Sequence, residues 1–113
     1  MSTSNTPDDG DALMVYVSAP PDAAAALAST LVAERFAACV SVLPGVRSVY
    51  RWNGAVQQDE ESLLLIKTGA DRFEALRQRI VDLHPYELPE VVAVRWQHAH
   101  EPYRQWVLDS TRP

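Results

Sequence analysis

The Asn53-Gly54 dipeptide is the feature that most constrains how this chain can fold. Both central residues of a type I′ turn have positive φ, which asparagine and glycine adopt most readily, so this dipeptide between two strand-like segments is a strong hairpin signal. The preceding segment, residues 39–52, is rich in valine and aromatic residues, and the following one, residues 55–68, ends in an apolar run. We therefore predict a long β-hairpin across residues 39–68.

The two arms of this hairpin carry further signals. Pro44-Gly45 interrupts the first arm, and a proline without an amide donor next to a glycine predicts a bulge in a bent edge strand. The second arm begins with polar residues and becomes apolar at residues 63–66, so its first half should project beyond the core. A two-residue turn also places Arg47 opposite Glu60, which is a pair of opposite charges across the strands.

The segment before the hairpin predicts one strand and one helix. Residues 12–18 form a continuous apolar run that ends near Pro20-Pro21 and is typical of a buried central strand. Asp22 is the expected N-cap of a helix that runs to about Phe36. Apolar residues at helical spacing predict its buried face: Ala24, Leu27, Ala28, Leu31 and Val32.

A second helix is predicted after the hairpin. Asp71 and Glu74 have the spacing of a capping box at its start. Pro85 disfavours helical geometry at His84, so the helix should end there. Its buried stripe is expected to consist of Phe73, Leu76, Ile80 and Leu83.

The C-terminal part adds a strand over residues 90–97 and a short helix from about Pro102, with Tyr103, Trp106 and Val107 turned inward. The complete order is β-α-β-β-α-β followed by a helix, which is the ferredoxin-like split βαβ arrangement of the α+β class. We expect an antiparallel sheet with its helices on one face. Because apolar edge strands and a projecting hairpin invite pairing with another chain, we also expect a homo-oligomer.

Composition and charge limit the class of protein. The 113 residues suit one domain, expected over residues 12–113, after a disordered tail over residues 1–11 without apolar periodicity. That tail holds three of the fifteen acidic residues, which leaves twelve against ten basic ones and a net charge of −2. Such a balance provides no basic surface for nucleic acid. A single cysteine excludes an intrachain disulfide, and no apolar run approaches the ~18 residues of a membrane span, so we expect a cytoplasmic protein.

Five short motifs resemble, in the same order, those of the CutA family of divalent-cation tolerance proteins. They are residues 37–45 (AACVSVLPG), 48–54 (SVYRWNG), 66–68 (IKT), 84–90 (HPYELPE), and His98 with Tyr103 and Trp106. The resemblance covers about Val15 to Leu108 and implies a tight homotrimer of ferredoxin-like subunits with intersubunit strand pairing, similar in build to PII signalling proteins. It also implies a role in tolerance of copper and other divalent metals. No catalytic activity is established for the family as a whole, so we expect no enzyme and no catalytic residues.

The resemblance also bears on a copper site. The family's proposed ligands are a cysteine near the end of the first strand and two histidines before the Pro-Tyr, where this chain has Val17 and Leu83-His84. Only His84 matches, so we expect weak binding of copper or another divalent metal through this residue. The structural alternative is that His84 caps the C-terminus of its helix.

The other metal-ligating residue types have a simpler interpretation. Cys39 follows a helix and opens a strand among apolar neighbours, which predicts a buried small side chain rather than a nucleophile or ligand. His98 and His100 alternate onto one side of a strand end, and we expect only weak surface metal binding there.

A cleft between subunits is the sharper candidate for a ligand site. The family motifs place Trp52 beside the hairpin tip, Lys67 near the end of the third strand, and Tyr86 with Glu90 in the loop before the fourth. Lys67 is the only lysine and lies in an apolar segment, where an unpaired ammonium is unfavourable. We expect it to pair with Glu61 or Glu90, as a structural ion pair, or to belong to a site for a small anionic ligand.

Other functions of the same fold make different demands. An acylphosphatase-like enzyme needs a phosphate-binding loop, but residues 18–22 contain no glycine and two prolines without amide donors. An RNA-recognition fold needs aromatic residues on the third strand, where this chain has QQDEE followed by aliphatic residues. A PII-like signalling protein that senses an anionic metabolite between subunits remains the alternative, although a long basic, glycine-rich loop is missing.

Overall fold

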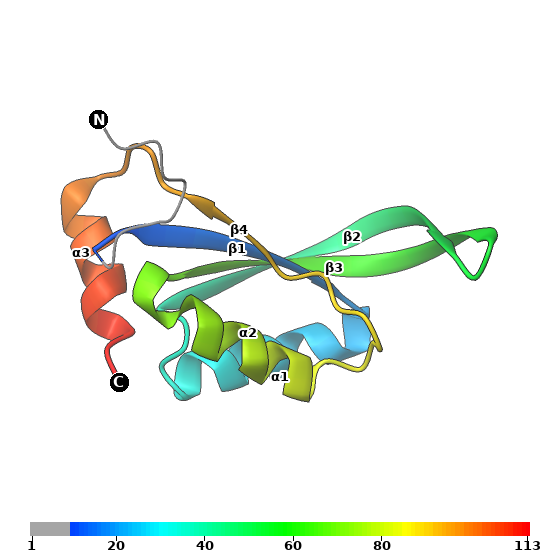
Figure 1. Cartoon of the computed structure of the whole chain (residues 1–113), viewed down its shortest axis with the longest axis horizontal. Helices are drawn as coiled ribbons and strands as arrows, with labels where there is room; N and C mark the ends of the chain where they lie inside the picture. The colour runs from blue at the N-terminus through cyan, green and yellow to red at the C-terminus, as the bar shows by residue number, and fades with distance from the viewer. Residues whose placement is uncertain (1–9) are drawn as a thin grey trace.

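The computed structural model describes residues 10–113, so the predicted tail lies outside the described residues except for its last two positions. The elements in chain order are β1 (Ala12–Ala19), α1 (Pro21–Ala33), β2 (Cys39–Trp52), β3 (Ala55–Gly69), the 3-10 turn η1 (Ala70–Arg72), α2 (Phe73–Leu83), β4 (Val92–Arg95) and α3 (Glu101–Ser110) (Figure 1). The strands form one antiparallel sheet in the order β2-β3-β1-β4. The predicted ferredoxin-like α+β arrangement is therefore confirmed. Within the described residues, no helix has the length and apolar character that a membrane crossing requires.

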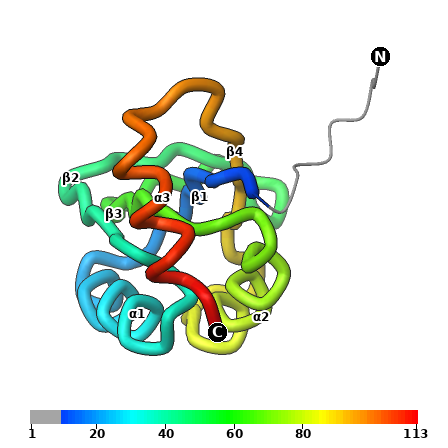
Figure 2. Tube along the Cα trace, turned by 90° about the vertical axis from the view of Figure 1, so that its left-hand side faces the viewer, coloured from blue at the N-terminus to red at the C-terminus, as the bar shows by residue number. Residues whose placement is uncertain are grey.

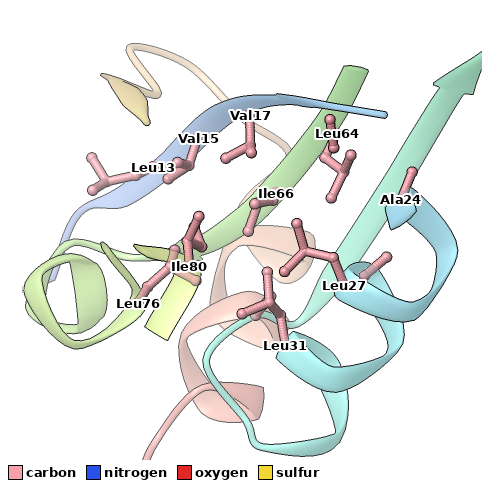
Figure 3. Close-up of a cluster of buried hydrophobic side chains, with 13 residues drawn as sticks. Leu13, Val15, Val17, Ala24, Leu27, Leu31, Leu64, Ile66, Leu76 and Ile80 are labelled. Atoms are coloured by element: carbon pink, nitrogen blue, oxygen red, sulfur yellow. The ribbon is translucent and has the colours of Figure 1, made fainter. Parts of the chain in front are cut away.

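Two helices cover one face of this sheet. Figure 2 shows α1 and α2 side by side on the same side of the strands, and Figure 1 shows α3 at the end of the sheet away from the hairpin turn. Alternate residues of β1 and β3 point toward the two helices and form the core with them (Figure 3): Leu13, Val15, Val17, Leu27, Leu31, Leu64, Ile66, Leu76 and Ile80. Each such buried side chain contributes about 1.5–3 kcal/mol.

The hairpin follows the prediction. Asn53 and Gly54 join β2 to β3 with φ values of 52° and 77°, as a type I′ turn requires. Arg47 lies opposite Glu60, which confirms the predicted register. Residues 55–60 are all exposed, and Figure 1 shows the tip of the hairpin extending beyond the helices.

The predicted bulge is present and changes the direction of the side chains. Leu43 pairs with Leu63 and Val46 with Glu61, so β2 advances by three residues while β3 advances by two. Gly45 within the bulge has a φ of 76°. Because side chains alternate along a strand, one extra residue reverses the face to which every later side chain of β2 points.

The helix starts differ from the prediction. α1 begins at Pro21 rather than after a capping Asp22, because proline suits the first helical position. Asp71 lies in η1 and makes no capping hydrogen bond, and Glu74 pairs instead with Arg77 at 2.6 Å. None of the three carboxylates predicted to cap a helix, Asp22, Asp71 and Glu74, makes a capping hydrogen bond.

Several side chains predicted to face the core are exposed: Val32, Leu83, Tyr103 and Trp106. Val32 follows Ala24 by eight residues, which at 3.6 residues per turn places it about 80° around the helix from Ala24, beyond the edge of the buried stripe. Tyr103 and Trp106 stack on each other, with ring centroids 5.5 Å apart, and Tyr103 also stacks on Trp96. β4 is shorter than predicted, since only four of its residues pair with β1.

Candidate ligand cleft

A cleft of about 710 Å³ lies between the hairpin and the loop of residues 84–91, which joins α2 to β4. We call it the hairpin cleft. Four parts of the chain line it: Ser18 of β1, residues 48–52 of β2, Glu61 of β3, and loop residues 85–88 with Glu90. Its volume lies within the roughly 300–1,000 Å³ that is typical of small-molecule sites.

The bulge in β2 brings aromatic side chains to this cleft. Val46 lies opposite Glu61, and Tyr50 and Trp52 follow Val46 at even spacing, so all three share the face of Glu61. Without the extra residue at Gly45, the same two rings would point to the other side of the hairpin. The bulge is therefore required for Tyr50 and Trp52 to line the cleft.

His84 anchors the opposite wall. It is 7 % exposed, its Nε2 lies 2.8 Å from the backbone oxygen of Ser18, and its Nδ1 accepts a hydrogen bond from the backbone N–H of Tyr86 at 3.1 Å. Since Nδ1 accepts, Nε2 carries the proton and donates to Ser18. The His84 and Tyr86 rings also pack at 4.7 Å between centroids. These contacts hold the start of the loop against the end of β1.

Tyr86 connects this loop to β3. Its hydroxyl donates to Oε2 of Glu61 at 2.7 Å, and Glu61 is only 5 % exposed. Burial of the phenol and its hydrogen bond to Glu61 raise the pKa of Tyr86 well above the ordinary value. Tyr86 is therefore a protonated donor at neutral pH. The hydroxyl of Tyr50 donates to Asp59 further along the hairpin, and this bond raises the pKa of Tyr50.

Carboxylates dominate the charge of the cleft. Glu61, Glu87 and Glu90 line it, and Arg51 is the one cationic side chain among the described lining residues. None of the three glutamates belongs to an ion pair of the described chain, whose acidic partners are Glu34, Glu74, Glu101 and Asp109. The hairpin cleft therefore presents uncompensated negative charge beside aromatic rings.

Of the five residues predicted for a cleft between subunits, four lie together within one chain and line the hairpin cleft: Trp52, Glu61, Tyr86 and Glu90. Lys67 does not, because it lies six residues from Glu61 along β3, roughly 20 Å at 3.3 Å per residue. Its Nζ donates to Oγ of Ser41 at 2.5 Å and lies 3.8 Å from Sγ of Cys39. It takes part in none of the ion pairs of the described residues, so Lys67 does not pair with Glu61 or Glu90 within one chain, and a pair between subunits stays a prediction. The neighbouring strand, rather than a carboxylate, supplies its polar contacts.

The metal-ligating side chains do not converge. Residues 10–113 contain no group of three or more His, Cys, Asp and Glu side chains placed to hold a metal ion. Both ring nitrogens of His84 have partners within the chain, half-buried Cys39 contacts Lys67, and His98 and His100 are exposed before α3. This donor set does not fit a tight copper centre.

Tyr50 and Glu87 are cleft residues that the sequence interpretation missed. Tyr50 stands two residues before Trp52 in the same strand, so the alternation of side chains would have placed both on one face. Glu87 lies in an irregular loop, where no periodicity indicates the direction of a side chain.

Fold and cleft together define a small ferredoxin-like protein with a ligand-sized, acidic and aromatic cleft beside an extended hairpin. The sequence model of the family described as "CutA1 divalent ion tolerance protein" matches residues 13–110. The chain belongs to this family, as its motifs suggested.

Known proteins resemble the chain over most of its length. Divalent-cation tolerance protein CutA of Thermus thermophilus is 41 % identical over 99 residues, which are 87 % of this chain and 96 % of the relative. Protein CutA, chloroplastic, of Arabidopsis thaliana is 42 % identical over 101 residues, which are 88 % of this chain but 56 % of that longer protein. The solved structure of the PII-like protein CutA from Nostoc sp. PCC 7120 has a TM-score of 0.85 at 35 % identity and covers 88 % of this chain and 97 % of its own.

Proposed function

We propose that this protein acts in divalent-cation tolerance as a non-enzymatic homotrimer whose working site is the hairpin cleft. The names of its relatives support the role in tolerance. The main observation in favour of this site is the hydrogen bond between Tyr86 and the buried Glu61. It connects the loop of residues 84–91 to β3, and both segments line the cleft.

The exposed apolar surface of the sheet supports the trimer. On the face away from α1 and α2, to which the strand register assigns both residues, Leu43 is 52 % exposed and Val92 is 53 % exposed. The hairpin adds Val56, which is more than half exposed. Further copies of the chain would bury these side chains and pair with the sheet edges. Light scattering in solution should then give three times the chain mass of 12.6 kDa.

The chemistry of the cleft supports a binding role. Its titratable groups are carboxylates, phenols and the guanidinium of Arg51. The neighbouring imidazole of His84 uses both nitrogens to hold the loop, so it does not activate the Ser18 or Ser48 hydroxyl as a base. We therefore propose that the protein binds and releases a ligand without transforming it.

Metal contact is proposed to be weak. The metal-ligating side chains of the described residues do not fit a tight copper centre. Tolerance would therefore depend on whether a ligand occupies the hairpin cleft, and not on sequestration of Cu²⁺. The alternative of an anionic metabolite has less support within one chain, because Lys67 lies outside the cleft and Arg51 is the one cationic side chain among the described lining residues. The cytoplasmic location stays a prediction.

A complementation experiment tests this function. A copper-sensitive host without its own homologue should regain growth in Cu²⁺ when it expresses the chain, and should not regain it with Glu61→Gln. Glu60→Gln, at the adjacent exposed position opposite Arg47, is the matched control and should rescue growth. Equal rescue by the Glu61→Gln variant would contradict the proposal.

A further inference from the structure

We propose that Asn53 is a site of spontaneous covalent modification, and that the folded turn protects it. The backbone nitrogen of Gly54 and a water molecule convert its side-chain amide to a carboxyl group. The reaction starts from molecules in which the hairpin end has opened, and not from the type I′ turn itself. Because both reacting residues are neighbours in one chain, the reaction needs neither a bound ligand nor a second subunit.

The order of these two residues makes the side chain reactive. Asn53 is followed directly by Gly54. The nitrogen of the residue after an asparagine can close a cyclic imide with the side-chain carbon Cγ, and glycine, which has no Cβ, hinders this approach least. The other asparagine of the chain, Asn5, precedes Thr6, whose branched side chain crowds the corresponding nitrogen. The sequence therefore makes Asn53 the more reactive of the two.

The reaction has two steps, and water is the only co-reactant. The backbone nitrogen of Gly54 loses its proton and forms a bond to Cγ of Asn53, while the bond from Cγ to Nδ2 breaks and Nδ2 leaves as ammonia. Water then opens the cyclic imide at one of its two carbonyl carbons. One opening gives an ordinary aspartyl residue. The other gives an isoaspartyl residue, in which the main chain runs through the side-chain carbon and gains a methylene group.

The conformation of the turn keeps the reacting atoms apart. Asn53 and Gly54 have φ values of 52° and 77°, and the hairpin closes at the pair of Trp52 and Ala55. As the mirror image of a type I turn, a type I′ turn gives its first central residue a ψ of about +30°. The Gly54 nitrogen then lies nearly opposite Cβ of Asn53 across the Cα–C bond, whereas ring closure requires the two to be nearly eclipsed. The rate of modification should therefore follow the population in which the hairpin end is open.

The two products have different consequences for the hairpin. The aspartyl product retains a favourable turn, because Asp-Gly suits a type I′ turn as Asn-Gly does. The isoaspartyl product has extra backbone length within a two-residue turn, so the pair of Trp52 and Ala55 cannot close in its native register. An opening that leads to this product is therefore irreversible.

Peptide mapping by mass spectrometry on the full-length protein tests the proposal. Samples are incubated at mildly alkaline pH, folded or unfolded in urea, and the amide-to-carboxyl mass change is followed in the tryptic peptide of residues 52–67. We expect Asn53 to react at least about tenfold more slowly in the folded protein than in urea, since only the open population reacts. In urea, Asn53 should react faster than Asn5. The variant Asn53→Gln is the control and should lack the fast reaction, because its longer side chain closes a larger ring.

Two results would overturn the proposal. Equal rates in the folded and unfolded protein would show that the turn gives no protection, and an Asn53 amide that survives in urea as long as that of Asn5 would remove the site itself. Hydrogen exchange after refolding tests the consequence. The isoaspartyl product should lose the protection of the Trp52 and Ala55 amides, whereas the variant Asn53→Asp should keep it. Equal protection in both would contradict the predicted loss of register.

Discussion

The hydroxyl of Tyr86 donates a 2.7 Å hydrogen bond to Glu61, although the two residues lie 25 positions apart. Tyr86 belongs to a loop anchored by His84 on the end of β1, and Glu61 lies on β3 just beyond the last pair that β3 makes with β1. The bond therefore closes the cleft at the point where the sheet narrows to the hairpin. Stability and ligand binding should both depend on it.

Replacement of Tyr86 by phenylalanine tests how much this hydrogen bond stabilises the folded protein. Tyr86→Phe removes the donor to a buried carboxylate, which should lower the free energy of unfolding by about 1–3 kcal/mol. Urea denaturation provides the measurement. Tyr50→Phe is the control, because its bond to Asp59 lies on the exposed hairpin and should matter less. An equal loss in both variants would contradict a special role for Tyr86.

The stability of the protein at high pH should depend on the protonation of the same phenol, Tyr86. The folded state raises the pKa of Tyr86, so the unfolded chain loses this proton first as the pH increases. The stabilisation is present in full below about pH 10, the ordinary tyrosine value, and is lost as the pH rises through the folded pKa. Denaturation curves between pH 8 and 11 should show this fall in the native protein and a smaller one in Tyr86→Phe.

The bulge can be tested at its glycine. Gly45 has a φ of 76°, and a Cβ there would meet no atom within 4 Å, so Gly45→Ala reports the backbone conformation alone. We expect a loss of about 1 kcal/mol. Gly10→Ala is the control, since a Cβ there also has open space. Deletion of Gly45 should have a second effect: Tyr50 and Trp52 would change faces and ligand binding would disappear.

Copper binding should depend little on His84. Its ring nitrogens bond Ser18 and Tyr86, so His84→Ala should destabilise the loop rather than remove a metal ligand. Weak surface binding should decline more in the double variant His98→Ala, His100→Ala. Calorimetry with Cu²⁺ distinguishes the two. Sub-micromolar affinity that vanishes in His84→Ala would show that the loop opens to provide a metal ligand.

Local chemistry made much of the fold predictable. Asn53-Gly54 defined the turn, and its two residues fixed the pairing of Arg47 with Glu60. Pro44-Gly45 indicated the bulge, but the sequence interpretation did not follow it to its consequence, the reversal of faces that exposes Tyr50 to the cleft. The helix starts were missed because prolines and a 3-10 turn replaced the side-chain caps.

It was harder to predict which residues far apart in the sequence lie close together in the structure. Trp52, Tyr86 and Glu90 came from family motifs, whereas the ion pair of Lys67 was argued from charge alone. Charge does not specify distance along a strand, and Lys67 and Glu61 lie six positions apart on β3, which separates them within one chain. Glu61 was named as a partner for the lysine, and the structure gives it Tyr86 instead.

The most direct test of the hairpin cleft uses the three tryptophans as reporters. Trp52 lines the cleft, whereas Trp96 and Trp106 lie in the aromatic stack with Tyr103 at α3. In ¹⁵N-labelled protein, Glu61→Gln should shift the indole N–H signal of Trp52, which lines the same cleft, and the other two should stay in place. The control Glu60→Gln should shift none of the three signals. Movement of the Trp96 or Trp106 signal without that of Trp52, or no shift at all, would contradict the account.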